Sequence, residues 1–278
     1  MSTHNDPSIT ERPTRPVALI TGASAGIGAA FARELASRGY DLVLTARRQE
    51  RLDALARSIE TDSGCSTWTI AADLADPQAP ALIMQQVTQH GLVIEALVNN
   101  AGYGVPGAYT SSDWETHQRF LQVMVLSIAE LTHRCLPAMK ASACGRIINI
   151  ASLAGLVPSS AGHTLYGAVK SWLIKFSEAL SFELRNKGIV VTAVCPGFTH
   201  SEFHDVTGTR EQASKMPNYM WMTAEVVAQQ AIDASMRSEN FIINGRVNRL
   251  IAWLARHLPR WLVYRLMATQ VKQFRDES

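Results

Sequence analysis

The stretch VALITGASAGIG, residues 17–28, decides the fold class. A short apolar run is followed by a turn with three glycines, and the helical pattern AAFARELASRG begins directly after it. Glycines let the backbone turn sharply and approach a ligand closely, while a helix N-terminus offers free N–H groups to a pyrophosphate. The spacing G-x-x-x-G-x-G occurs in many tight turns, but at a first strand–helix junction it favours a dinucleotide site. The residues of this turn expected at the cofactor are Gly22, Ser24, Gly26, Ile27 and Gly28.

Further short apolar runs alternate with longer helical patterns along the chain. Most of these runs lack polar alternation, as expected of parallel strands covered on both faces. The expected strands are residues 17–21, 41–45, 66–71, 94–98, 146–150, 189–194 and 240–243. Repeated strand–helix alternation implies right-handed crossovers. The sequence therefore predicts a single-domain, Rossmann-like α/β fold: a doubly wound parallel sheet of about seven strands with helices on both faces.

Three signals predict where helices begin. Asp76 precedes a proline and is expected to be an N-cap followed by proline at the first helical position. Ser112 and Glu115 form a capping box. Thr223 is expected to cap the helix that follows it.

Length and composition fit one domain. The chain has 278 residues, of which 47% are hydrophobic and 18% charged, and no linker or repeat divides it. We expect a flexible leader over 1–16, the Rossmann domain over 17–245, and a basic, amphipathic helical extension over 246–278. A net charge of +2 gives no reason to expect a nucleic-acid partner. Four cysteines without CxxC spacing predict reduced thiols in a cytoplasmic protein.

The end of the second expected strand should select the cofactor. An NAD site carries an acidic side chain about 20 residues past the glycines. Here the sequence reads TARRQER, with Arg47 and Arg48 and no acid until Glu50. Guanidinium groups suit a 2′-phosphate, so we predict NADP(H). The alternative is that these arginines are a solvated start to the next helix.

The stretch LYGAVKSW, residues 165–172, places Tyr166 and Lys170 four apart, on one face of an otherwise apolar helix. Such a pair occurs often as a surface contact. Reduction of a carbonyl, however, builds negative charge on its oxygen, and a proton donor must meet it. A tyrosine pKa of about 10 is too high for easy exchange near neutrality; a nearby ammonium or a cationic nicotinamide lowers it. With the glycine turn at the start of the chain, the catalytic interpretation is favoured over a surface pair.

Taken together, these motifs resemble the short-chain dehydrogenase/reductase family over most of residues 17–245. The arginine-rich stretch and the C-terminal extension are similar to its NADP-preferring branch. The motifs that carry the resemblance are TGASAGIG at 21–28, Asp73, NNAG at 99–102, Ser152, Tyr166-x-x-x-Lys170 and PGFTHS at 196–201.

The resemblance implies a role for each motif. Tyr166 would be the acid/base, Lys170 would tune it and hold the nicotinamide ribose, and Ser152 would orient the substrate. Asp73 would meet the adenine. Family members form dimers or tetramers through helices near 113–141 and 164–186, so a homodimer or homotetramer is implied. The other cofactor residues that the resemblance implies are Asn99, Ala101, Gly102, Pro196, Gly197, Thr199 and Ser201.

At one position the chain departs from the family pattern. The family usually has an asparagine in its fourth long helix, where it holds a water that relays protons to the lysine, and here that position is Met124. A thioether accepts hydrogen bonds weakly and cannot donate one. Either the relay is slower, or a group such as Ser127 substitutes, or turnover is lost. We hypothesise an active enzyme with an altered relay.

The sequence thus predicts an NADP(H)-dependent oxidoreductase that interconverts an alcohol and a carbonyl. The rival is a non-catalytic NADP-binding sensor or membrane-surface scaffold, which Met124 and the basic tail favour. Apolar residues near the expected site suggest a lipid-, steroid- or terpenoid-like substrate, and these are Leu153, Leu156, Val157, Phe198 and Phe203.

The tail carries seven Lys or Arg and no Asp or Glu from Gly245 to Arg275. Basic and apolar residues alternate there at helical spacing. One interpretation is peripheral contact with an anionic membrane through 246–272. The other is packing against the subunit or its partner as a wall of the substrate pocket.

Two further features predict no chemistry. His200 and His204 are four apart, but no third ligand is evident, so no metal site is expected. Cys195 has no obvious activating base and is interpreted as a packing residue at a strand end.

Overall fold

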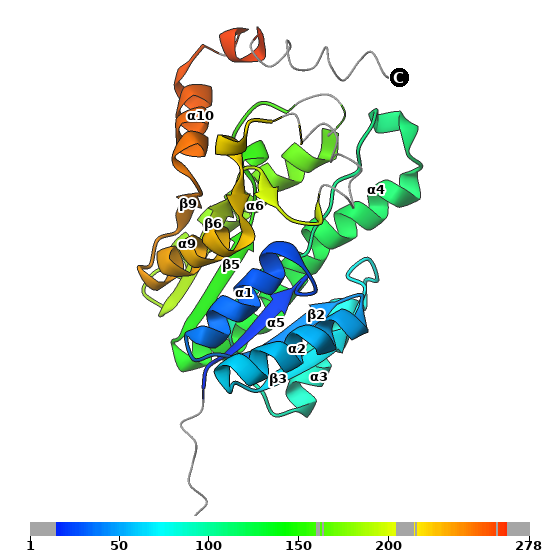
Figure 1. The fold of residues 1–278 in the computed structure, drawn as a ribbon, viewed down its shortest axis with the longest axis vertical. Coiled ribbons are helices and arrows are strands. Elements are labelled where there is room, and N and C mark those ends of the chain that lie inside the picture. The colour runs from blue at the N-terminus through cyan, green and yellow to red at the C-terminus, as the bar shows by residue number, and fades with distance from the viewer. Residues whose placement is uncertain are drawn as a thin grey trace, which may run out of the picture.

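A seven-stranded parallel sheet forms the centre of the molecule, with strand order β3-β2-β1-β4-β5-β6-β9 (Figure 1). The computed structural model describes residues 15–159, 162, 164–203, 214, 216–259 and 261–265. Every expected strand is found within one residue of its predicted bounds, so the doubly wound parallel fold is confirmed. The strands are β1 (Val17–Thr21), β2 (Asp41–Ala46), β3 (Thr67–Ala71), β4 (Ile94–Asn99), β5 (Gly145–Ile150), β6 (Ile189–Cys195) and β9 (Phe241–Ile243).

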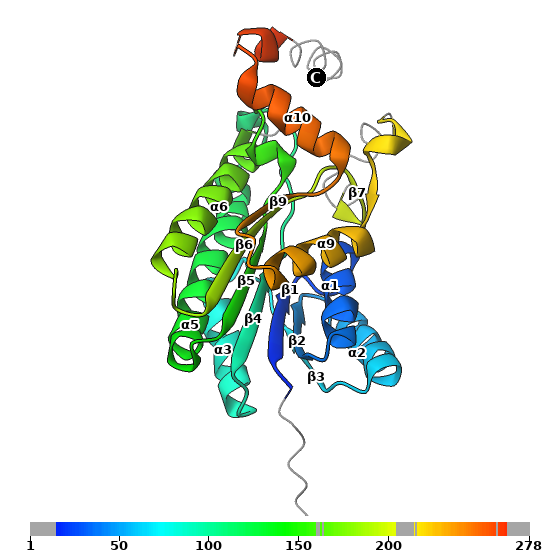
Figure 2. The ribbon, with the colours of Figure 1, turned by 90° about the vertical axis from the view of Figure 1, so that its left-hand side faces the viewer.

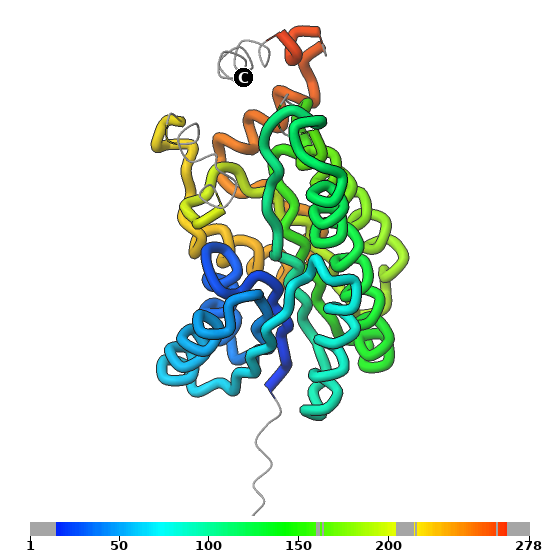
Figure 3. Tube along the Cα trace, turned by 90° about the vertical axis from the view of Figure 1, so that its right-hand side faces the viewer, coloured from blue at the N-terminus to red at the C-terminus, as the bar shows by residue number. Residues whose placement is uncertain are grey.

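Helices cover both faces of this sheet, as Figures 2 and 3 show from opposite sides. Along β1, Ala18 and Ile20 belong to one apolar core and Val17 and Leu19 to the other, because successive strand residues point to opposite faces. Both cores are apolar, which explains why polar residues do not alternate with apolar ones along the strands. On one face lie α1 (Gly26–Ser37), α2 (Gln49–Ser63) and α9 (Ala224–Met236); on the other lie α3 (Ala79–Gln89), α5 (Ser127–Ser142) and α6 (Thr164–Glu183).

The sheet reverses its direction of growth between β1 and β4. The loops after these two strands separate at the carboxyl edge, and such a crevice is where open parallel sheets bind ligands. Thr21, the last residue of β1, ties the two loops together: its Oγ1 accepts the backbone N–H groups of Asn100 and Ala101, both at 3.0 Å. The Asn100 side chain in turn donates to the Thr21 carbonyl at 2.9 Å.

Two of the three predicted helix starts are wrong. Helix α3 begins at Ala79, because Asp76 closes a turn ahead of it, its carboxylate accepting the Gln78 N–H at 2.8 Å. Helix α4 (Trp114–Leu121) is capped by Asp113, whose Oδ1 accepts the Thr116 N–H at 2.8 Å, and not by the preceding Ser112. A carboxylate one residue closer to the first turn takes the capping position. The Thr223 cap of α9 is confirmed.

The segment after β6 carries a small sheet that the sequence did not predict and the first helix of the expected C-terminal extension. A second, two-stranded parallel sheet pairs β7 (Thr199–His200) with β8 (Met222–Thr223). Helix α10 (Arg246–His257) then crosses above the carboxyl ends of the strands (Figure 2). Within the described ranges, no helix is long and apolar enough to span a membrane. The expected leader up to residue 14, His204 and the tail beyond residue 265 lie outside the described residues.

Candidate active site

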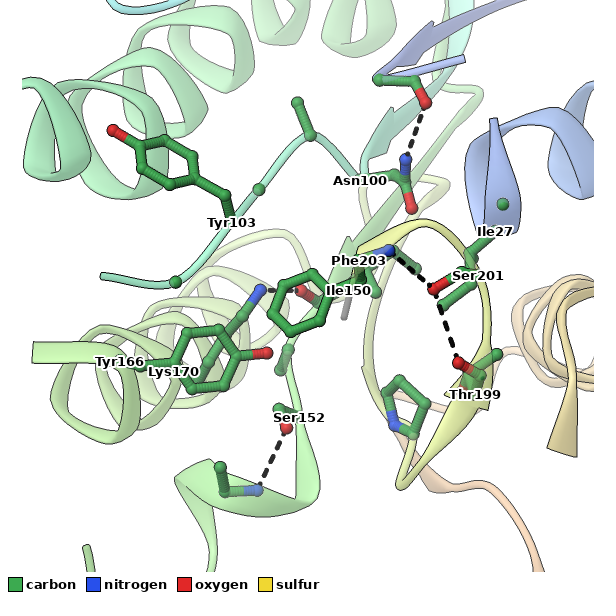
Figure 4. Close-up of a pocket in the computed structure, with 18 of the residues that line it drawn as sticks. Ile27, Asn100, Tyr103, Ile150, Ser152, Tyr166, Lys170, Thr199, Ser201 and Phe203 are labelled. Carbon is green, nitrogen blue, oxygen red and sulfur yellow. Dashed lines mark hydrogen bonds between the residues drawn. The ribbon is translucent and has the colours of Figure 1, made fainter. Parts of the chain in front are cut away.

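A cavity of about 950 Å³ lies at the carboxyl edge of the sheet, in the crevice beside β1 and β4. Its walls come from the loops after six strands of the sheet, β1 to β6, from the start of α6 and from α10. This volume is at the upper end of that typical of ligand and cofactor sites. Figure 4 shows the part of the cavity where polar side chains gather.

Ser152, Tyr166 and Lys170 all line this cavity. Ser152 follows β5, while Tyr166 and Lys170 come from the first two turns of α6 and share one face, as their spacing predicts. Lys170 Nζ lies 5.7 Å from the centre of the Tyr166 ring. The Ser152 hydroxyl oxygen accepts the Ala154 N–H at 3.1 Å, so its own proton is available to a further acceptor.

Lys170 is a buried cation, with 5% of its surface exposed. Its Nζ donates to the carbonyl oxygen of Ile150 at 2.6 Å (Figure 4). One carbonyl does not replace the hydration of an ammonium group, so burial lowers the pKa of Lys170 to about 8. Lys170 therefore titrates within reach of physiological pH.

The expectation that Lys170 lowers the pKa of Tyr166 is not met in this structure. Burial raises the pKa of Tyr166 to about 12, and the neighbouring Ser152 hydroxyl only partly opposes that rise. The reason is geometric: the Lys170 hydrogen bond is made to Ile150 and not to the phenol oxygen. At neutral pH Tyr166 is thus a protonated donor.

The glycine turn lines the opposite part of the cavity. Gly22 and Gly26 have φ values of +67° and +54°, which favour glycine, and a Cβ at Gly22 would lie 2.9 Å from the Ala101 Cα. Ser24 and Ile27 also line the cavity. Gly28, expected at the cofactor, does not: a Cβ there would lie 2.2 Å from the Gly22 carbonyl oxygen, so its role is to let α1 pack against the turn.

In the NNAG motif the two asparagines have different places. Asn99, expected at the cofactor, is buried inside the sheet opposite Asn149 and donates to its Oδ1 at 2.8 Å, without lining the cavity. Asn100, which was not predicted, lines it together with Ala101 and Gly102. Strand alternation could have indicated this, because neighbouring residues point to opposite sides.

The two arginines after β2 both line the cavity. Arg48 donates to Ser24 Oγ at 3.2 Å and to Glu202 Oε2 at 3.0 Å, while Arg51 donates to Glu202 Oε1 at 2.6 Å. Hydrogen bonds from Arg51 and then Arg48 lower the pKa of Glu202. Glu202 was missed from the sequence, since 154 residues separate it from Arg48 and no local pattern links them. Asp73 also lines the cavity, and its Oδ2 accepts from Arg119 at 3.0 Å.

The segment after β6 and helix α10 complete the walls. Of the expected apolar residues, Leu156 packs instead against Leu173 and its neighbours, away from the cavity. For helix α10, the sequence left open whether it contacts a membrane or forms a wall of the pocket. Its residues line the cavity, so the second interpretation is confirmed. The expected residues that line the cavity are Pro196, Gly197, Thr199, Ser201, Leu153, Val157, Phe198 and Phe203, and those of α10 are Ile251, Leu254 and Ala255, with Leu258 just beyond it.

Met124 lies in a π-helical turn (Gln122–Leu126) that joins α4 to α5. It is 1% exposed, and its sulfur packs against Gly102, so it does not line the cavity. Ser127, the suggested substitute, is also buried and donates to the Leu74 carbonyl at 2.8 Å. Ser127 therefore does not take over the place of the missing asparagine.

Cys195 and His200 were both interpreted from the sequence as residues without a chemical role. Burial raises the pKa of Cys195 to about 12, which confirms a packing thiol without a thiolate. His200 stacks on Trp221, with ring centres 4.6 Å apart. Across the described part of the chain, no group of three or more His, Cys, Asp or Glu residues could hold a metal ion.

The family model for short chain dehydrogenase matches residues 16–212. The chain belongs to the short-chain dehydrogenase family. A very-long-chain 3-oxoacyl-CoA reductase of Anas platyrhynchos is 31% identical over 266 residues, covering 93% of this chain and 80% of the relative.

Solved structures of short-chain dehydrogenases share the fold over nearly the whole chain. One from Sphingobium yanoikuyae in complex with NADPH superposes with a TM-score of 0.77 at 31% identity, covering 93% of this chain and 95% of that one. The bulky-bulky ketone specific alcohol dehydrogenase from Comamonas testosteroni superposes with a TM-score of 0.72 at 28% identity, covering 94% of each.

The buried ammonium predicts a pH-dependent cost in stability. The folded-state pKa of Lys170, about 8, lies below the ordinary lysine value of 10.5. The ionised lysine therefore destabilises the fold below about pH 8, and this cost disappears as the pH rises to 10.5. We expect Lys170→Met to raise the unfolding free energy by about 1 to 3 kcal/mol near pH 7, and the gain to shrink near pH 10. Urea unfolding without cofactor measures both.

The matched control is Lys175→Met, which removes an exposed lysine from the same helix. Its effect should be small at both pH values. A Lys170→Met gain that is the same at both pH values would contradict the assignment to the buried charge.

Proposed function

We propose that the protein is an NADP(H)-dependent oxidoreductase that interconverts an alcohol and a carbonyl compound. The observation that carries this proposal is that Ser152, Tyr166 and Lys170 share one cavity with the glycine turn and with Arg47. The residues fit a dinucleotide: Gly22, with φ of +67°, lets the turn pack closely against the loop after β4 at the edge of the cavity, and Arg47 lines the cavity without an ion pair to a described residue.

The geometry supports a division of labour in the reducing direction. Bound NADPH would supply the hydride. Tyr166, protonated at neutral pH, donates its proton to the oxygen of the substrate. The Ser152 hydroxyl, whose oxygen accepts the Ala154 N–H, can donate its own proton to the same substrate oxygen and orient it. Lys170, whose Nζ lies 5.7 Å from the centre of the Tyr166 ring, would hold the ribose of the nicotinamide.

The substrate we propose is a bulky, hydrophobic carbonyl compound. Apolar side chains after β6 and along α10 form the substrate end of the cavity, and Phe203 lies 5.7 Å from the Tyr166 ring, centre to centre. The similarity to a very-long-chain 3-oxoacyl-CoA reductase and to a bulky-bulky ketone specific alcohol dehydrogenase supports the same class.

We also propose a homodimer or homotetramer. Large apolar side chains are exposed on the helices that the family uses for assembly: Trp114 on α4, Leu126 in the π-helical turn and Phe182 on α6. Light scattering of the full chain gives the mass directly.

Activity tests the proposal against its rival. NADPH absorbance should fall with bulky hydrophobic ketones, and Tyr166→Phe should slow turnover about a hundredfold or more, because the proton donor is lost. Tyr109→Phe removes a phenol outside the cavity and should match the parent. Tight NADPH binding without turnover of any carbonyl compound would instead support the non-catalytic sensor or scaffold, which the buried Met124 favours.

Glu202 should weaken the preference for the phosphorylated cofactor, since its carboxylate occupies Arg48 and Arg51. These pairs are exposed, so each contributes at most about 1 kcal/mol. We expect Glu202→Gln to lower the Kd for NADPH by up to about fivefold and to leave the Kd for NADH unchanged. Isothermal titration with both cofactors measures this, with Glu50→Gln as an exposed acidic control. Equal changes for both cofactors would refute competition with the 2′-phosphate.

The position of Met124 should limit the proton relay. Met124→Asn places a donor and an acceptor in the π-helical turn, so we expect it to shift the pH–rate profile of ketone reduction and to change turnover. Met124→Leu keeps the volume without adding polar atoms and should retain the parental profile. If the Asn and Leu variants give the same profile, this position has no part in the relay.

A further inference from the structure

Helix α10 has two different faces. Ile251, Leu254 and Ala255 line the cavity. Arg249, Leu250, Trp253 and Arg256 are exposed and follow one another at helical spacing, so they share the outer face. The cavity wall and this outer face are thus two sides of one helix.

The outer face carries large apolar groups in water. Leu250 is 56% exposed and Trp253 55% exposed, and they are three residues apart. Just beyond α10, Trp261 and Tyr264 are exposed as well, at 66% and 48%. Tryptophan and tyrosine are the residues that concentrate where a bilayer meets water, because one part of each ring system is apolar and the other polar.

The arginines of the same face have no acidic neighbours along the chain. No Asp or Glu occurs between residues 246 and 265. The exposed arginines of this segment form no ion pair with any residue of the described ranges, whereas Arg134 of α5 pairs with Glu130 one turn earlier at 2.8 Å. These arginines are Arg246, Arg249, Arg256 and Arg265.

We propose that the outer face of α10 and residues 261–265, called the docking face below, binds the surface of an anionic lipid bilayer. Arginines among exposed Trp, Tyr and Leu complement phospholipid headgroups in charge and the acyl boundary in polarity. The helix is too short to cross a bilayer, so it lies in the plane of the interface.

Docking also gives the site its substrate class. The substrate class, which rests on the proposed function, is a membrane-resident, amphiphilic lipid carbonyl compound. The wall of the cavity is the helix that touches the lipid, and Val263 lines the cavity between the exposed Trp261 and Tyr264. Asn248 holds α10 in place, since its Nδ2 donates to the Asn244 carbonyl at 2.7 Å. The cavity that contains Tyr166 therefore extends to the helix and the residue that border the docking face.

Co-sedimentation of the full chain with vesicles tests docking without reading turnover. The parent should pellet with phosphatidylcholine vesicles that contain phosphatidylserine, and less so with phosphatidylcholine alone or in high salt. The double variant Arg249→Glu/Arg256→Glu should weaken binding by about fivefold or more for each arginine. Leu250→Glu/Trp253→Glu should abolish pelleting. Point variants are used because removing α10 would also remove the cavity wall.

Two matched controls lie on other helices. Arg57→Glu reverses an exposed charge on α2 that forms no ion pair with a described residue, and Leu82→Glu charges an exposed leucine of α3. Both should pellet like the parent. A water-soluble ketone should be reduced equally by the parent and all four variants, so loss of docking and failure of the proposed function give different results.

Two results would overturn the proposal. One is pelleting that does not depend on phosphatidylserine or is unchanged in both docking-face variants. The other is a parent that fails to pellet and elutes as an oligomer, while Leu250→Glu/Trp253→Glu elutes as a smaller species, because a second copy of the chain would then cover this face.

Discussion

The parallel sheet grows outward in opposite directions from β1, because the chain crosses back after β3 and lays β4 on the other side of β1. The loops that follow β1 and β4 must therefore separate. Thr21 limits that separation, since its hydroxyl oxygen accepts the backbone N–H groups of both Asn100 and Ala101. The cavity occupies the resulting crevice, so its position follows from this junction and not from the loops that later enclose it.

Burial of Tyr166 and Lys170 shifts the pKa of each group and also destabilises the fold. Lys170 is buried and Tyr166 is partly buried at the cavity, and the shift in each pKa favours the neutral form. The rigid packing of α6 holds both groups in place, with Val169 and Leu173 buried beside them. A surface pair at the same spacing would be more stable but would keep an ordinary lysine and an ordinary phenol. Burial of this pair therefore destabilises the fold, and it gives the site a phenol that stays protonated and an ammonium group that titrates close to neutrality.

Local patterns in the sequence were sufficient to predict the strands, the glycine turn and the pair on α6. Seven apolar runs fixed the strands, because a strand buried on both faces needs continuous apolar residues. The spacing of Tyr166 and Lys170 placed them on one face of a helix before any contact was known. Gly22 and Arg48 were found for the same reason, since a turn and a strand end are set by a few neighbouring residues. The family resemblance then added Ser152, whose role no local pattern could assign.

Other features of the site depend on contacts between distant segments, and these became visible only in the tertiary structure. The folded chain brings the Glu202 carboxylate into hydrogen-bond contact with Arg48. Asn100 lines the cavity instead of the expected Asn99, because strand register sets which side chain faces inward. The tertiary structure also set the direction of the Tyr166 pKa shift, since burial and the orientation of Lys170 depend on the whole core. The two faces of α10 have the same origin. A helical pattern shows that a helix is amphipathic, but only packing shows which side meets the cavity and which is left to the surroundings.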